Sequence, residues 1–262
     1  MRTEKYIRQR ITEIQENYLK MIPESRTWLE KVEFVILPQI NRQQVIQRTC
    51  EKLGAEAPEY LPDTIAEVIS SEQGYAVLIY PENTDDLFEL RFTIAHELGH
   101  VCANIANREI DEEWRYDIVC QRDTPIRSGG AVWSEFIADA IGYHITGEQF
   151  ERYNISELRN HMLTLLYLSF QDEQINPVNL GHLCAFILCN RRMRKVQMQQ
   201  GLLAKVDDFR PEVLNGISAI IKVLDGQIHE TVFWHVSRDK LIQLGDAVDQ
   251  LWNECFWYGV LL

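Results

Sequence analysis

The 262-residue chain lacks several features that mark common classes of protein. It has no uncharged apolar run of the 18 or so residues that a transmembrane helix needs. Its first residues, MRTEKYIRQR, are too polar for a secretory signal. None of its six cysteines forms a CxxC pair, and the closest two are Cys184 and Cys189. We therefore expect a cytoplasmic protein whose thiols are reduced and mostly buried.

Positive charge is also scarce in this chain. The 26 Lys and Arg residues face 39 Asp and Glu residues, which gives a formal net charge of −13. Such a charge repels the phosphates of nucleic acid. The basic cluster NRRMRKVQ, residues 190–197, suits the C-terminal end of a helix, where cations interact favourably with the helix dipole. The sequence therefore predicts direct binding neither to nucleic acid nor to a membrane.

The first third of the chain mixes helical and strand-like patterns. Apolar spacing predicts a helix over the first 20 residues and another over Arg42–Leu53, which Gly54 ends. VEFVILPQI, residues 32–40, is either a short strand or the end of a buried helix. A short helix is expected after Pro62, and Val77–Tyr80 predict a strand.

The rest of the chain is mainly helical in pattern. Possible caps at residues 83–85 open a long helix, and an irregular loop is expected from Asn107 to Gly130. Helical spacing returns at residue 131 and continues over the segments 156–170, 177–199, 211–224 and 232–257. The sequence thus predicts an α+β, mostly helical chain with a small sheet. A weak boundary near residue 150 separates the segments 1–150 and 151–262.

The motif with the clearest chemistry is IAHELGH, in which His96 and His100 lie four residues apart on a predicted helix. Positions i and i+4 project side by side, so two imidazoles can reach one zinc ion at about 2.0–2.1 Å. Glu97 lies about 100° round the helix, where it can act as a general base. Burying three polar side chains on an apolar helix costs free energy when they have no partner, and a bound metal offsets that cost. The motif therefore predicts a metal site.

A zinc site of this kind needs a third protein ligand. The histidine that some extended HExxH motifs carry six residues later is absent, because that position is Ala106. Glu135 is the preferred ligand, since Asp139, one turn later, can then accept the free N–H of a ligand histidine. The open alternatives are His144, Asp111 and the pair Glu112–Glu113.

The strand predicted before the motif fits a second requirement of a peptidase. Peptidases commonly hold an extended substrate by adding it to the edge of a sheet. The strand at 77–80 would place such an edge next to the metal helix, although an ordinary core strand fits its pattern equally well.

Three segments together resemble the ImmA/IrrE family of zinc metallopeptidases. They are RFTIAHELGHV, the preceding LPDTIAEVISSEQGYAVLIYPEN, and WSEFIADAIGYHI, and they cover about residues 60–150. The resemblance implies a minimal zincin-like core that binds one Zn²⁺ per chain through His96, His100 and Glu135, with Glu97 as the general base. Family members act in the bacterial cytoplasm and often cleave a helix-turn-helix repressor.

The expected function is therefore a zinc-dependent endopeptidase whose partner is a basic DNA-binding repressor. Tyr143 and His144 are candidate stabilisers of the oxyanion. The alternatives are hydrolysis of a small amide, or a non-catalytic zinc protein that regulates through its acidic helical region. A fourth protein ligand would favour the non-catalytic protein, because closed sites are structural. No function is predicted for the region 151–262, where His182 and His235 are expected to be core or surface histidines.

Overall fold

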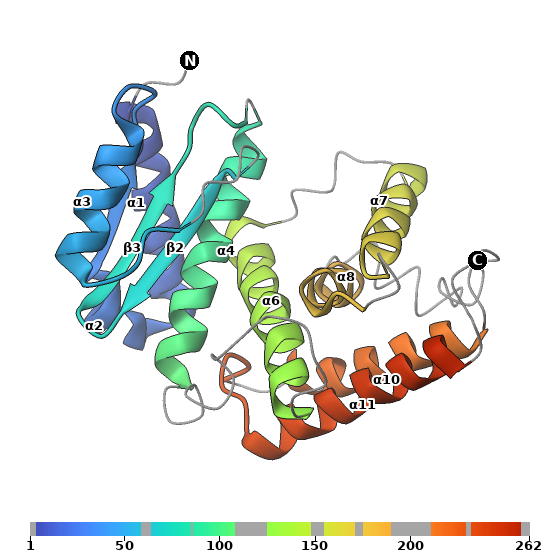
Figure 1. The fold of residues 1–262 in the computed structure, drawn as a ribbon. Coiled ribbons are helices and arrows are strands. Elements are labelled where there is room, and N and C mark those ends of the chain that lie inside the picture. Colours follow the sequence, from blue (N-terminus) through green and yellow to red (C-terminus); the bar gives the residue numbers. More distant parts are fainter. Residues whose placement is uncertain are drawn as a thin grey trace. The chain divides into compact units, whose positions relative to one another are not determined.

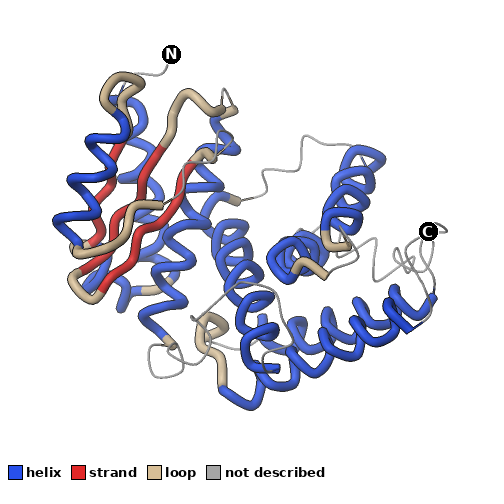
Figure 2. The backbone as a smooth tube through the Cα atoms, viewed as in Figure 1, coloured by secondary structure: helices blue, strands red, loops and turns tan. Residues whose placement is uncertain are grey.

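The computed structural model describes residues 4–58, 64–84, 86–107, 125–147, 155–170, 175–189, 211–228 and 232–257. These residues are mostly helical with one small mixed sheet, which confirms the predicted α+β class (Figures 1 and 2). They form two compact units, Met1–Cys102 with Ile141–Gly147, and Ala103–Ala140 with Glu148–Leu262. The predicted boundary near residue 150 lies outside the described residues. Within them, no helix has the length and apolar character of a membrane span.

The sheet of the first unit has three strands in the order β1-β3-β2. β1 (Val32–Ile36) runs parallel to β3 (Gly74–Ile79), and β2 (Ala66–Ser71) pairs with β3 in antiparallel register. VEFVI is therefore a strand, and the short helix predicted after Pro62 is wrong where the structure describes this segment. The buried residues of β2, Ala66 and Ile69, are three apart, a spacing that also fits a helix. Pairing with β3 overrides that local pattern.

The central position of β3 corrects a second prediction. Figure 2 shows β3 between the other two strands, and both of its edges are hydrogen-bonded. Of the two interpretations of the strand at 77–80, the open sheet edge is therefore wrong and the core strand is correct, because β3 is paired on both sides. Among the described strands, β1 and β2 are the outer ones.

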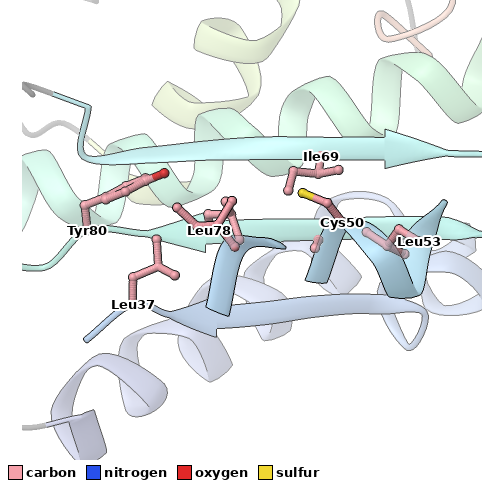
Figure 3. Packing of buried hydrophobic residues seen from close by; sticks show 8 residues of the cluster. Leu37, Cys50, Leu53, Ile69, Leu78 and Tyr80 are labelled. Carbon is pink, nitrogen blue, oxygen red and sulfur yellow. The ribbon is translucent and has the colours of Figure 1, made fainter. Parts of the chain in front are cut away.

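A compact apolar cluster holds helix α3 (Arg42–Leu53) against the sheet (Figure 3). Gly54 ends this helix as predicted, since its φ of 66° lies in the left-handed region that glycine adopts readily. Val77 and Ile79 point to the other face of β3 and are also fully buried, so both faces of this strand are covered. The cluster comprises Leu37, Ile46, Cys50, Leu53, Ile69, Ala76, Leu78 and Tyr80.

Helices α1 (Glu4–Met21) and α4 (Leu87–Ala106) complete the part of this unit that concerns the motif. α1 buries Ile7, Ile11, Ile14 and Tyr18, and it is followed by the 3-10 turn η1 (Pro23–Ser25) and the short helix α2 (Arg26–Leu29). The Tyr18 hydroxyl donates a hydrogen bond of 3.0 Å to the carbonyl of Ala95. α1 therefore fixes the turn of α4 immediately before His96.

The start of α4 is capped close to where the sequence predicted. The amide of Phe88 donates to Asp86 Oδ1 at 2.8 Å, and the amide of Asp86 donates to Thr84 Oγ1 at 3.0 Å. Asp85 lies outside the described residues.

The second unit contains α7 (Ile155–Leu168), α8 (Pro177–Cys189), α10 (Pro211–Ile228) and α11 (Arg238–Trp257), together with most of α6 (Pro125–Thr146). α6 begins at Pro125, so residues 125–130 are helical and not irregular; proline fits a first helical turn, which explains the error. Residues 232–237 form a turn, where a helix was predicted. Most of the predicted loop, residues 108–124, lies outside the described part, as do residues 190–199 with the basic cluster.

One buried side chain joins distant segments of this unit. Asn107 Nδ2 donates to the carbonyls of Ala103 and Trp234 at 2.7 and 2.9 Å, and its Oδ1 accepts from the amide of Val236 at 2.8 Å. The end of α4 is therefore tied to the turn between α10 and α11. These two helices pack along each other (Figure 1). Leu251 approaches Gly216 closely.

Candidate metal centre

The HExxH residues lie on the buried face of α4. His96 and Glu97 are only 9% and 8% exposed, and His100, one turn later, is half-buried. The Nε2 atoms of the two histidines are 3.0 Å apart. Ligands that bind zinc tetrahedrally at about 2.0–2.1 Å lie roughly 3.3–3.4 Å from each other. The histidine pair therefore has nearly the spacing of two zinc ligands, as the sequence predicted from their positions.

The two candidate oxyanion stabilisers have different environments. Tyr143 packs against Phe92, with ring centroids 5.0 Å apart, and Phe92 lies one turn before His96 on α4. Gly142 leaves room for the same ring, since a Cβ there would come within 3.1 Å of it. His144 is exposed at the end of α6. The Phe92 ring thus connects Tyr143 to the helix of the motif.

Glu135 and Asp139 lie one turn apart on α6, and both approach His182 on α8. His182 Nδ1 lies 2.8 Å from Asp139 Oδ2, and its Nε2 lies 3.5 Å from Glu135 Oε2. Asp139 is only 4% exposed, so its charge needs this partner. Asp139 thus lies against an imidazole nitrogen, but of His182 and not of a histidine in the HExxH motif, so its predicted role beside a ligand histidine stays a prediction.

A glycine allows α8 to reach these carboxylates. A Cβ on Gly181 would lie 2.6 Å from the carbonyl oxygen of Val132 and 2.7 Å from Glu135 Cβ. Such contacts are too close for any other residue, so the glycine sets how near α8 comes to α6. His182, the next residue, is thereby placed beside Glu135 and Asp139.

Glu135 and His182, both in the second unit, are among the described residues that could each offer one ligand atom to a metal ion. The predicted ligands His96 and His100 lie together in the first unit, so the predicted set of His96, His100 and Glu135 is divided between the two units and stays a prediction. Two imidazoles and a carboxylate suit zinc. The other predicted candidates, Asp111 and the Glu112–Glu113 pair, lie outside the described residues.

His182 was missed from the sequence, where it was expected to be a core or surface histidine. It comes 47 positions after Glu135, so no local spacing connects the two. A weaker signal was present: α8 is apolar on all sides, and eight of its residues are buried. A histidine in such a helix needs a polar partner from another element.

The described cysteines do not add ligands to this group. Cys50, Cys102 and Cys184 are buried, and none of them forms a disulfide. Burial raises the pKa of the Cys102 thiol on α4 and of the Cys184 thiol on α8. Zinc binds thiolates, so thiols that stay protonated are poor ligands.

Comparison of the chain with protein-family models, with curated proteins and with solved structures found no match.

Proposed function

We propose that this protein is a zinc-dependent endopeptidase of the HExxH type with a zincin-like core, similar to the ImmA/IrrE family. The observation that carries the proposal is the pair His96–His100, whose Nε2 atoms are 3.0 Å apart on a helix that also buries Glu97. A buried carboxylate next to two imidazoles has the composition of a peptidase site, and a metal would offset the cost of burying these groups.

The proposed ligands are His96, His100 and Glu135, with Asp139 supporting the site through a histidine. When bound, zinc acts as a Lewis acid and lowers the pKa of a water molecule that it holds. Glu97 is the proposed general base: its carboxylate would accept a proton from the attacking water and pass it to the leaving amine. Tyr143 is the better placed of the two candidates for steadying the oxyanion, because it packs on Phe92 near His96.

The proposed substrate is a basic DNA-binding repressor. A net charge of −13 attracts a basic partner at long range, and this attraction weakens as salt is added. An extended segment of the substrate has two outer strands to pair with among the described residues, β1 and β2.

The first test compares the wild type with Glu97→Gln, and uses His235→Ala as the control because His235 is exposed and far along the chain in the turn after α10. Zinc content is measured beside cleavage of a set of purified helix-turn-helix repressors of positive net charge. We expect one zinc per chain in all three proteins. Cleavage should fall about 10²–10⁴-fold in Glu97→Gln only, since the base is lost and the metal stays. Wild-type cleavage should also slow above about 0.15 M salt.

Two results would count against this proposal. A Glu97→Gln protein that cleaves as fast as the wild type would contradict the role of Glu97 as the general base. A wild-type protein that contains no metal after purification with zinc would contradict the proposed metal centre itself.

A second candidate function is favoured by His182, which lies against the proposed ligand Glu135. If this histidine also binds the metal, four protein ligands close the site, and closed sites are structural. The chain would then be a zinc-stabilised regulator that binds its partner without cleaving it. Removal of zinc with a chelator separates the two functions: a structural site unfolds, whereas a catalytic site loses activity and keeps its fold.

A further inference from the structure

An aromatic side chain extends the face of α4 that bears the two histidines of the motif. Phe92, His96 and His100 are spaced four residues apart, and such positions lie about 40° from one another around a helix. The ring of Phe92 lies beside that of His96, with centroids 6.4 Å apart and planes inclined by 32°. All three residues belong to the first compact unit. The face with the proposed metal ligands therefore continues, one turn earlier, as an apolar aromatic surface.

A second ring of the same unit supports Phe92. The ring centroid of Tyr143 lies 5.0 Å from that of Phe92, and the planes are inclined by 59°, which is a favourable arrangement for two aromatic rings. The neighbouring Gly142 gives the Phe92 ring its room, since a Cβ there would lie 3.1–3.4 Å from three of the ring atoms. Residues 141–147 belong to the first unit together with α4 up to Cys102. Contacts within one unit thus fix the position of the Phe92 ring.

Neither of the two rings is fully covered. Phe92 and Tyr143 are half-buried, whereas Ile94, Ala95 and Leu98 of α4 are 0% exposed. Ligand sites in proteins are lined mainly by apolar and aromatic side chains with a few polar groups that fix the orientation of the ligand. An accessible aromatic pair beside His96 has the character of such a lining.

The distance along the helix determines which part of a substrate reaches Phe92. Four residues of an α-helix rise about 6 Å, and successive residues of an extended chain are about 3.3 Å apart. A peptide whose cleaved bond lies at His96 therefore brings a side chain one or two residues from that bond over the Phe92 ring. A phenyl ring offers no polar hydrogen-bonding group, so it favours an apolar side chain over a polar one that must lose its water.

We propose that Phe92 is a specificity-determining residue, which selects a large apolar side chain one or two residues from the cleaved bond of the substrate. This inference rests on the proposed function and deepens it, because it names the kind of bond that the peptidase cleaves. Tyr143 is then a positioning residue for Phe92 in addition to its proposed place near the oxyanion.

The inference adds a condition on the substrate. Large apolar side chains are mostly buried in folded proteins, so a bond beside one of them is hidden while the substrate is folded. Such a bond becomes accessible where the chain opens locally, and an opened segment is also the kind that pairs with the edge of a sheet. Local unfolding of the repressor therefore precedes its cleavage.

The test measures the binding of peptide hydroxamates, which hold zinc through their hydroxamate group, to the zinc-loaded protein by calorimetry. One series varies the first residue beside that group and a second series varies the next residue, each through phenylalanine, leucine, serine and aspartate. In one of the two series we expect phenylalanine and leucine to bind the wild type at least about tenfold more tightly than serine, because burial of such a side chain is worth that factor. This preference should be lost in Phe92→Ala.

Two variants serve as matched controls. Phe88→Ala removes a partly exposed ring one turn earlier on the same helix, and it should keep the preference because eight residues place it about 12 Å along α4 from His96. Tyr143→Phe keeps both rings and removes only the hydroxyl. Its preference should also persist, and any loss of rate in a proteome-derived peptide library should be equal for apolar and polar cleavage sites.

Two further variants guard against a folding defect in Phe92→Ala, with circular dichroism as the check. Phe92→Leu keeps an apolar side chain and should keep the preference for phenylalanine and leucine over serine. Gly142→Ala displaces the Phe92 ring without removing it, so the preference should weaken while the hydroxamate group still binds zinc.

The outcomes distinguish this inference from the proposed function. Hydroxamates that bind with no side-chain preference, or with a preference that Phe92→Ala and Gly142→Ala leave unchanged, would overturn the role of Phe92 and leave the peptidase proposal standing. A wild type that holds zinc and binds none of the hydroxamates has no accessible metal site, which would overturn both proposals.

Discussion

Asp139 and His182 are joined by a contact of 2.8 Å between Oδ2 and Nδ1, and the carboxylate is almost fully buried. The two residues come from different helices, α6 and α8, and are 43 positions apart. Their contact defines the orientation of the imidazole ring and therefore the position of its Nε2 atom.

Replacing Asp139 by Asn should weaken metal binding without removing a ligand. The neutral amide holds the His182 ring less firmly, and this ring lies 3.5 Å from Glu135, the proposed ligand, so the position of Glu135 becomes less well defined. We expect zinc affinity to fall about 10–100-fold, measured by competition with a chromophoric chelator. An unchanged affinity would show that Asp139 supports only the packing of α6. The control for loss of a buried polar group is Ser169→Ala. Ser169 is buried in the same unit and directly follows α7.

Gly181→Ala should disturb the same group through the backbone. The added Cβ would lie 2.6 Å from the carbonyl oxygen of Val132, which cannot move as a side chain can. α8 must therefore shift away from α6 and carry His182 from Glu135 and Asp139. We expect a lower melting temperature together with weaker zinc binding.

The control for that experiment is Gly216→Ala on α10. Its Cβ would clash with Leu251, 2.7 Å away, and so lower the stability of the α10–α11 pair. Zinc binding should persist in this variant. Equal loss of zinc affinity in both variants would mean that the effect of Gly181 is only general destabilisation.

Glu67 on β2 should make stability depend on pH. Burial raises the pKa of this carboxyl, although its hydrogen bond with the Tyr80 hydroxyl opposes the shift. Between the unfolded pKa of about 4.3 and the raised folded pKa, the folded state binds more protons than the unfolded state. Stability therefore falls as the pH rises through this interval, and it stays lower above it.

Glu67→Gln should remove this fall while keeping an acceptor for Tyr80. We expect the variant to melt at a higher temperature than the wild type at neutral pH and at a similar temperature near pH 4. Glu72→Gln, in the exposed turn between β2 and β3, is the matched control. If both variants follow the wild-type pH profile, burial of Glu67 does not affect stability.

Helix periodicity and spacing predicted much of the fold. α1, α3 and α4 fall close to their predicted ranges because each has apolar residues at helical intervals and a clear stop or cap, such as Gly54 after α3. The side-by-side placement of His96 and His100 follows from helix geometry alone.

Features that depend on distant partners were not predicted. The central position of β3 follows from its pairing with β1 and β2, and the sequence of one strand does not determine which strands pair with it. β2 was mistaken for a helix because Ala66 and Ile69 have helical spacing. His182 has no local feature that selects Glu135 and Asp139 as its neighbours, since the approach of α8 depends on the tertiary packing at Gly181.

Two hydrogen bonds of Asn107 can form only late in the synthesis of the chain. Its partners Trp234 and Val236 come 127 and 129 positions later. At synthesis rates of about 5–20 residues per second, these partners emerge roughly 6–25 s after Asn107. Until then its amide lacks these two native partners, so the C-terminal end of α4 gains its native hydrogen bonds to them only after most of the chain has been made.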